Sequence, residues 1–283
     1  MSFQNNGVAT LISMQYENIK AQILYRGMFM KVAVRRFSFF YLVAAIFISP
    51  TATFAETVNI AVAANFTDPA KEMAQIFREK TGHDAIFSFG PSGQFYAQIK
   101  ESAPFQIFLS ADEERPKKLV EEGFAVPNGS FTYAIGRLVL WSKKPGFVKN
   151  EEVLKKGNFT KISIANPASA PYGVAAIEVM KALNVYDALK SKIVEGNSIA
   201  QTFQFVDSDN AELGFIAQSQ IMTRTGGSGW QVPQKLYKEI RQDAVLLKSG
   251  ENNEAAKAFI TFLKGSVAKN IIKKFGYAIP GKP

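Results

Sequence analysis

Four short segments of the sequence place an uncharged hydrogen-bond donor where an apolar strand pattern gives way to a helical one. These segments present Asn65, Ser92, Tyr172 and Ile199, the last through its backbone amide. The first turn of a helix has amides without intrahelical partners and carries a partial positive charge, so it can hold an anion without a basic side chain. The recurrence of this arrangement predicts a site for a fully ionised oxyanion, whose oxygens only accept hydrogen bonds.

The first segment shows the arrangement most clearly. Apolar residues alternate over 58–62, as in a half-buried strand, and recur with helical spacing over 70–77. Three residues between these patterns can cap the helix ahead of Pro69, namely Asn65, Thr67 and Asp68. On its own this is equally well an ordinary capped helix start, so the binding hypothesis depends on its repetition.

The other segments repeat this strand-to-helix arrangement with different residues. Ser92 is expected at the cap position of a helix over 94–101, and Ser198 at the cap of the helix that begins near Ile199. Tyr172 lies at the start of a helix, where its hydroxyl either points into a cleft or simply packs over the helix. The four starts, two from each half of the chain, predict a cleft between lobes at the carboxyl ends of strands.

Composition excludes several kinds of site. The chain of 283 residues has no cysteine and one histidine, His83, which is expected to be an exposed or partly packed loop residue. Disulfides, thiolate chemistry and cysteine-ligated zinc are therefore excluded, and no metal held directly by protein ligands is expected. Of the net charge of +9, residues 1–55 carry +4, from five basic side chains against one acidic. The remainder is dispersed, which favours a solvated surface over a nucleic-acid site.

Residues 28–55 have the three parts of a secretory signal. A basic start at Lys31, Arg35 and Arg36 precedes an apolar run over 37–48, and small residues follow. Cleavage is predicted after Ala55, with release into the periplasm. A retained anchor helix is the alternative, although the run is short for a membrane span. Residues 1–27 resemble neither a signal nor a domain, so translation is expected to start at Met28 or Met30.

From residue 56 onward, strand and helix patterns alternate, which indicates an α/β fold with a largely parallel sheet. A single strand over 133–141 is expected to pass from one lobe to the other. The glycine-rich residues 223–233 are expected to form a surface loop, and residues 243–248 a returning strand. Two amphipathic helices after that strand are expected to pack back on the first lobe.

Several motifs together resemble those of the periplasmic molybdate-binding proteins of ABC transporters. They include AANFT, SFGPSGQFYAQI, FTYAIGRLVLWS, NPASAPYG, EGNSIAQ and LGFIAQSQI, and the resemblance runs over about residues 58–277. It implies a two-lobed periplasmic-binding-protein fold of type II, with mixed sheets flanked by helices and a ligand cleft between the lobes. Residues 56–135 with 243–283 are expected to form lobe 1, and residues 136–242 lobe 2.

The resemblance also implies the ligand and the residues that hold it. The ligand-binding positions would be Ala64, Asn65, Ser92, Tyr172 and Ile199. The better-known branch of the family has a serine at the position of Asn65 and a tyrosine at that of Ala217, whereas this chain resembles the branch in which the tyrosine comes from the Tyr172 position. Ala64 would then contribute only its amide.

The implied function is that of a non-enzymatic, monomeric binding protein without a cofactor. It would capture molybdate, and also tungstate, and deliver the ion to a membrane permease with a cytoplasmic ATPase, with no nucleic acid as partner. Three alternatives stay open: a binding protein for another oxyanion such as sulfate, a secreted hydrolase using Ser92 with His83 as base, and a basic protein that binds nucleic acid or membrane surfaces.

Overall fold

The computed structural model describes residues 14–24, 26 and 55–281 of the chain. Residues 14–24 are helical and exposed, and belong to a unit, residues 1–54, that is separate from the unit formed by residues 55–283. The predicted signal sequence falls on residues 28–55, of which only Ala55 is among those described. Within the described residues, no helix has both the length and the apolar character needed to span a membrane.

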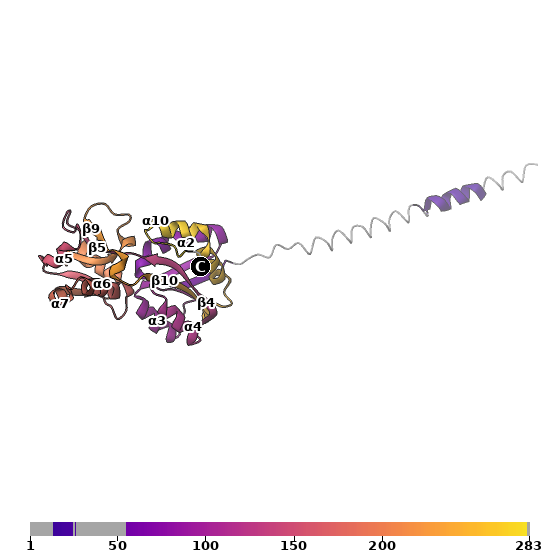
Figure 1. Ribbon diagram of the computed structural model, residues 1–283. Helices are drawn as coiled ribbons and strands as arrows, with labels where there is room; N and C mark the ends of the chain where they lie inside the picture. Colours follow the sequence, from indigo (N-terminus) through magenta and orange to yellow (C-terminus); the bar gives the residue numbers. More distant parts are fainter. Residues whose placement is uncertain (1–13, 25, 27–54, 282–283) are drawn as a thin grey trace, which may run out of the picture. The chain divides into compact units, whose positions relative to one another are not determined.

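The first sheet of the larger unit is mixed and has five strands in the order β2-β1-β3-β10-β4. β1 runs parallel to both of its neighbours, whereas β10 runs antiparallel to both of its own. The strands are β1 (Thr57–Ala63), β2 (Asp84–Gly90), β3 (Ile107–Leu109), β4 (Ala125–Gly136) and β10 (Ile240–Leu247). Figure 1 shows α2 and α10 on one side of this sheet and α3 and α4 on the other.

The second sheet is also mixed, with the order β7-β6-β8-β5-β9. β6 runs parallel to β7 and β8, and β5 runs antiparallel to β8 and β9. The strands are β5 (Leu138–Ser142), β6 (Ile162–Ala165), β7 (Ile193–Gly196), β8 (Leu213–Ala217) and β9 (Ser228–Gln231). The two mixed sheets agree with the fold class that the resemblance implied, rather than with one largely parallel sheet.

Two expectations about strands are wrong. β9 lies inside the glycine-rich segment predicted as a loop, because pairing with β5 supplies hydrogen bonds that its own residue types do not signal. The strand expected over 133–141 is two strands, β4 and β5, separated by Arg137 and belonging to different sheets. The chain returns to the first sheet through residues 232–239, which precede β10.

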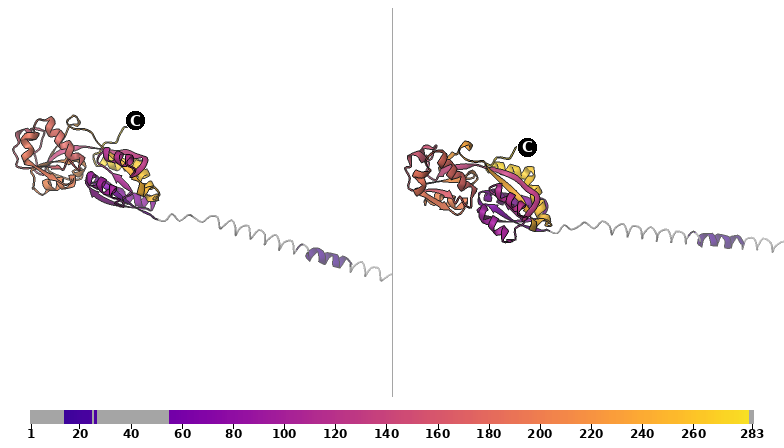
Figure 2. Two further views of the ribbon diagram at one scale, coloured as in Figure 1. Left: turned by 90° about the horizontal axis from the view of Figure 1, so that it is seen from below. Right: turned by 60° about the horizontal axis from the view of Figure 1, so that its bottom comes forward.

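We call the part built on the first sheet lobe 1 (residues 57–136 and 240–281) and the part built on the second sheet lobe 2 (residues 138–231). The lobe boundaries expected from the sequence stay a prediction. In Figure 2, the turned views show helices arranged around the strands in each lobe. Lobe 2 contains α5 (Glu152–Lys156), α6 (Pro171–Ala182), α7 (Tyr186–Leu189) and α8 (Ile199–Asp207).

An aromatic core holds the last helices of the chain on lobe 1. The helices of this lobe are α2 (Thr67–Thr81), α3 (Ser92–Lys100), α4 (Glu114–Glu121), α9 (Glu254–Lys264) and α10 (Ser266–Lys274). Phe259 of α9 is fully buried, and its ring centroid lies 5.2 Å from that of Phe77 on α2 and 5.8 Å from that of Phe87 on β2. α10 packs against α9 and α2. The two final helices therefore pack on the first lobe, as expected.

Replacing Phe259 by alanine is expected to lower the free energy of unfolding by about 3–5 kcal/mol, because it leaves a cavity beside the rings of Phe77 and Phe87. Urea denaturation followed by circular dichroism measures this change. Phe89→Ala is the matched control, since Phe89 is 37% exposed on the same sheet, and it should cost about 1 kcal/mol or less. Similar losses in the two variants would contradict the assignment of Phe259 to the core.

Candidate functional site

The five residues expected to bind a ligand all follow the carboxyl ends of parallel strands, and all are buried. Ala64 and Asn65 lie in a short 3-10 turn, η1 (Ala64–Phe66), directly after β1, and Ser92 begins α3 after β2. Tyr172 is the second residue of α6, after β6, and Ile199 begins α8, after β7. Their exposed fractions are 7%, 3%, 1%, 1% and 4% in chain order. Parallel pairing places the ends of β1 and β2 at one sheet edge and those of β6 and β7 at another.

Packing brings these positions together across the two lobes. Ala64, Tyr172 and Ile199 belong to one buried apolar cluster, which also contains Ala111. The Ser92 hydroxyl oxygen accepts a hydrogen bond of 3.0 Å from the Ala111 amide. Because η1 also packs against α8, the turn that carries Asn65 lies beside the helix that begins at Ile199.

The lobes also touch through their backbones at the start of α3. The Gly93 amide of lobe 1 donates to the Ser169 carbonyl oxygen of lobe 2 at 2.9 Å. A Cβ on Gly93 would lie 2.9 Å from the Ser169 Cα, so only glycine permits this approach. The Ser169 hydroxyl is in turn 3.4 Å from the carbonyl oxygen of Asn197, two residues before Ile199.

Two of the expected helix caps are absent and one is present. α2 continues directly from η1, so its N-cap is Phe66, and none of the three polar candidates caps it. Ser92 is the first helical residue of α3 rather than its cap, because its hydroxyl is turned toward the Ala111 amide. The expected cap of α8 is confirmed, since the Ser198 hydroxyl oxygen accepts from the Gln201 amide at 3.2 Å. That bond satisfies one amide of the first turn, and the Ile199 amide precedes it without an intrahelical acceptor.

A buried network of uncharged side chains connects Asn65 to Tyr172. The Asn65 amide nitrogen donates to the Gln242 side-chain oxygen and to the Tyr277 hydroxyl, both at 2.9 Å. Gln242 in turn donates through Nε2 to the Tyr172 hydroxyl at 3.2 Å. The hydroxyls of Tyr277 and Ser219 donate to the Asn65 carbonyl oxygen at 2.7 and 2.8 Å. The network therefore joins Asn65, Gln242 and Tyr277 of lobe 1 to Tyr172 and Ser219 of lobe 2.

Sequence reasoning missed Gln242, the residue at the centre of this network. Gln242 is fully buried on β10, but the returning strand was predicted to begin one residue later, so Gln242 appeared to be in a loop. Its signal was faint. A glutamine directly before an apolar strand is a polar residue at a position that strand pairing buries, and such a residue requires hydrogen-bond partners.

Burial keeps the tyrosines of the network in their protonated, hydrogen-donating form. It raises the pKa of Tyr172 well above the usual tyrosine value, and the neighbouring Tyr277, Tyr237 and Tyr133 raise it further. The pKa values of Tyr133 and Tyr277 are raised as well, mainly by burial. Tyr172 therefore remains a hydroxyl at neutral pH and can offer a hydrogen to an anion.

Gly136, the last residue of β4, is shaped by the same network. A Cβ at this position would lie 2.2 Å from the Tyr172 hydroxyl oxygen and 2.6 Å from Gln242 Nε2. Both distances are far shorter than any real contact of a Cβ atom. The point at which the chain leaves lobe 1 therefore has to be a glycine for Tyr172 and Gln242 to occupy their observed places.

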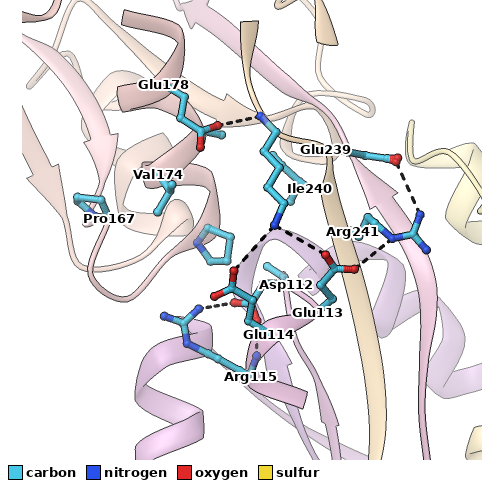
Figure 3. A pocket seen from close by; sticks show the side chains of 14 residues that line it. Asp112, Glu113, Glu114, Arg115, Pro167, Val174, Glu178, Glu239, Ile240 and Arg241 are labelled. Atoms are coloured by element: carbon cyan, nitrogen blue, oxygen red, sulfur yellow. Dashed lines mark hydrogen bonds and ion pairs between the residues drawn. The ribbon is translucent and has the colours of Figure 1, made fainter. Parts of the chain in front are cut away.

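Carboxylates surround a different cavity, which lies next to these residues (Figure 3). It has a volume of about 300 Å³ and contains none of the five expected binding residues, but shares Ala111 with their cluster. Several of its charges are paired: Glu113 lies 3.8 Å from Lys238 and 3.3 Å from Arg241, and Asp112 pairs with Arg115. Glu178 instead accepts a hydrogen bond from the Lys238 backbone amide. Within residues 55–281 and the short N-terminal helix, no group of His, Asp or Glu side chains is arranged to hold a metal ion.

His83 is buried, rather than exposed or partly packed as expected, and cannot serve Ser92 as a base. Its Nδ1 accepts a hydrogen bond of 3.1 Å from the Glu56 amide, at the end of the sheet where β1 begins. Ser92 follows the other end of β2, whose seven residues separate the two side chains by roughly 20 Å at a rise of about 3.3 Å per residue. The geometry thus removes the support for a serine hydrolase.

Comparison with known proteins links this architecture to solute binding. The sequence pattern of the family described as bacterial extracellular solute-binding protein matches residues 58–278. The molybdate-binding protein ModA of Rhodobacter capsulatus is 56% identical over 220 residues, which cover 78% of this chain and 87% of that protein. ModA of Azotobacter vinelandii is 54% identical over 229 residues, covering 80% and 91%.

A solved structure shows the same likeness in three dimensions. The periplasmic molybdate-binding protein of Azotobacter vinelandii superposes with a TM-score of 0.77 at 42% sequence identity. The match covers 79% of this chain and all of that structure. The arrangement of two mixed sheets with flanking helices is therefore shared with that protein.

Gly136→Ala is expected to lower the free energy of unfolding by about 1–3 kcal/mol, because the added methyl overpacks the space next to the Tyr172 oxygen. Combining it with Tyr172→Phe should recover part of the loss, since the oxygen that clashes is then gone. Gly281→Ala is the control, as no atom lies within 4 Å of the added Cβ. If Gly136→Ala behaved like Gly281→Ala in urea denaturation, the close contact would be disproved.

The raised tyrosine pKa values predict loss of stability in alkali. The folded state holds its tyrosine protons more tightly than the unfolded state does, so this contribution is complete below about pH 10 and is lost as pH rises through the folded pKa values. Urea denaturation at several pH values, with tyrosinate absorbance, measures the effect. Tyr133→Phe should make the decline shallower because it removes one raised pKa; an unchanged slope would count against the burial of Tyr133.

Proposed function

The chain belongs to the bacterial extracellular solute-binding proteins and, within them, to the molybdate-binding proteins, and we therefore propose that it captures molybdate in the periplasm for an ABC importer. Membership rests on a family match over residues 58–278 and on relatives that are more than half identical. The protein then acts by binding and release, without chemistry on its ligand. Tungstate, a close analogue in charge and shape, is proposed as a second ligand.

The observation that carries this proposal is the buried convergence of neutral donors at the junction of the lobes. Ala64, Tyr172 and Ile199 share one buried cluster, and Ser92 is hydrogen-bonded to Ala111 of that cluster. In the adjacent cavity, Asp112 and Glu113 are paired with basic side chains. A dianion that only accepts hydrogen bonds suits such a lining. Each charge-assisted bond contributes about 1.5–3 kcal/mol net, so several of them offset the desolvation of a small anion.

Selectivity follows from two different physical features. Monohydrogen phosphate carries a proton that needs an acceptor, and the proposed lining consists of donors. Sulfate matches molybdate in charge and in lacking a proton, so it must be rejected by size, because the metal oxyanion is larger and fills the site better. The proposed ligand residues are Ala64, Asn65, Ser92, Tyr172 and Ile199.

The proposed cellular role follows from the family and from the start of the sequence. Residues 28–55 have the pattern of a secretory signal, which would direct the protein to the periplasm with cleavage near Ala55. There a monomer would pass molybdate to a membrane permease coupled to a cytoplasmic ATPase. The two crossings of the chain between the sheets, at Arg137 and over residues 232–239, would allow the lobes to open and close around the ion.

Molybdate is expected to raise the melting temperature strongly, since a ligand at one hundred times its Kd stabilises the folded state by about 2.7 kcal/mol. Sulfate and phosphate at the same concentration should have little effect. Thermal unfolding and titration calorimetry with each ion measure this difference. Equal shifts for all three ions would refute the selectivity, and no shift with molybdate would refute the function.

Tyr172→Phe should weaken molybdate binding about 10- to 100-fold in calorimetry, because a hydrogen bond to a charged group contributes about 1.5–3 kcal/mol. Tyr186→Phe on α7 is the matched control, since it removes a phenolic hydroxyl from the same lobe outside the network, and it should bind as tightly as the unaltered protein. Equal affinity in the two variants would remove Tyr172 from the site.

A further inference from the structure

We propose that Gln242 is a positioning residue that fixes the direction in which the Tyr172 hydroxyl donates, and so makes the site favour oxyanions that carry no proton. The inference rests on the proposed function and adds to it a residue that acts through Tyr172. It follows from tracing which atom in the buried network must donate at each hydrogen bond. The assignment starts from the backbone carbonyl oxygen of Asn65, because a carbonyl oxygen can only accept a hydrogen bond.

The first link is the bond between Tyr277 and the backbone of Asn65. The Tyr277 hydroxyl oxygen lies 2.7 Å from the Asn65 carbonyl oxygen, and two oxygens approach so closely only with a hydrogen between them. Tyr277 must supply that hydrogen. Its oxygen is then an acceptor for the Asn65 side chain at 2.9 Å, so the atom of Asn65 that faces it is the amide nitrogen.

The second link passes from Asn65 to Gln242. The same Asn65 nitrogen lies 2.9 Å from the Gln242 side chain, and an amide nitrogen only donates, so Gln242 must present its oxygen. The Tyr133 hydroxyl, 3.1 Å away, donates to that oxygen as well. The amide group of Gln242 is thereby oriented from two sides, and its nitrogen has to face Tyr172.

The third link determines the state of Tyr172. Gln242 Nε2 donates to the Tyr172 oxygen at 3.2 Å, so the single hydroxyl hydrogen of Tyr172 must point away from Gln242. Within residues 55–281, the Tyr172 hydroxyl donates no hydrogen bond shorter than 3.5 Å, and the protein acceptor nearest in character is the Tyr277 hydroxyl, whose pKa is raised by burial and lowered in part by a longer interaction with Tyr172. Gln242 and Tyr172 are buried, at 0% and 1% exposure, and both lie in the space that a Cβ on Gly136 would occupy. That hydrogen is thus held ready for an acceptor supplied by the ligand.

The consequence is that the site discriminates between oxyanions by whether they carry a proton, and not by their charge. A tyrosine hydroxyl can both donate and accept, so alone it would serve the P–OH group of monohydrogen phosphate by accepting from it. With Gln242 donating to its oxygen, Tyr172 is directed to donate to the ligand. A protonated oxyanion then leaves one buried hydrogen unsatisfied, which costs about 1–3 kcal/mol, and discrimination by such an unpaired group is a common means of specificity.

Gln242→Glu tests the direction of donation. The ionised carboxylate cannot donate, so the Tyr172 hydrogen should turn toward it, and molybdate affinity measured by calorimetry at about pH 9 should fall by about tenfold or more. Burial raises the pKa of a glutamate, and the protonated carboxyl donates again, so affinity should recover about fivefold or more on going to about pH 6. The unaltered protein should change less than about twofold over this range.

The same variant in a Tyr172→Phe background separates positioning from simple charge repulsion. If Gln242 acts through Tyr172, Gln242→Glu should weaken binding by less than about threefold when the hydroxyl is absent, and the recovery at low pH should disappear. Persistence of the full loss in that background would overturn the inference, because repulsion does not require the hydroxyl. A loss in the single variant that does not recover at low pH would overturn it too.

Gln242→Met provides a second measurement that does not introduce a charge. Methionine has a similar length but donates nothing to Tyr172, so the hydroxyl is free to accept, and the ratio of molybdate to phosphate affinity should fall about tenfold. An unchanged ratio would overturn the inference. Failure of the proposed function is distinguishable from either result, because the unaltered protein would then fail to bind molybdate in the same calorimeter.

Discussion

An anion that leaves water must find a hydrogen donor for each bond it gives up, and this requirement explains why the junction of the lobes is built from neutral groups. Positive side chains there would hold any anion, and negative ones would repel it. Helix starts provide amides with partial positive charge and fixed direction. Asn65, Ser92, Tyr172 and Ile199 lie at such places, each after the carboxyl end of a strand.

Holding the donors in fixed directions requires close packing, so two positions at the junction have no room for a side chain and are glycines. Gly93 permits the backbone bond to Ser169 of the other lobe, and Gly136 permits the contact between Tyr172 and Gln242. The hydroxyls of Ser219 and Tyr277, one from each lobe, converge on the carbonyl oxygen of Asn65. The observed arrangement of these groups thus depends on contact between the lobes.

The charged residues near the junction have a separate role. Glu113, Lys238 and Arg241 line the adjacent cavity (Figure 3) and are bonded to each other across α4 and the segment that leads into β10. Pairing offsets the charges of Asp112 and Glu113, although the cavity as a whole is lined by five carboxylates and three basic side chains. Because these side chains are partly exposed, each pair contributes about 0–1 kcal/mol to stability, so their arrangement matters more for the local field than for the fold.

Local pattern was enough to identify the alternation of strands and helices, the apolar faces of the last two helices and the Ser198 cap, because each depends on neighbours in sequence. The same pattern placed the candidate donors at helix starts, and the resemblance of motifs supplied the ligand. Contacts between residues that lie from 19 to 177 positions apart in the sequence decided the rest. β9 is a strand because β5 lies beside it, Ser92 turns toward Ala111, and Gln242 is buried among side chains from Asn65, Tyr133 and Tyr172. Hydrogen-bond direction in such a network depends on every member at once, so only the tertiary structure could determine it.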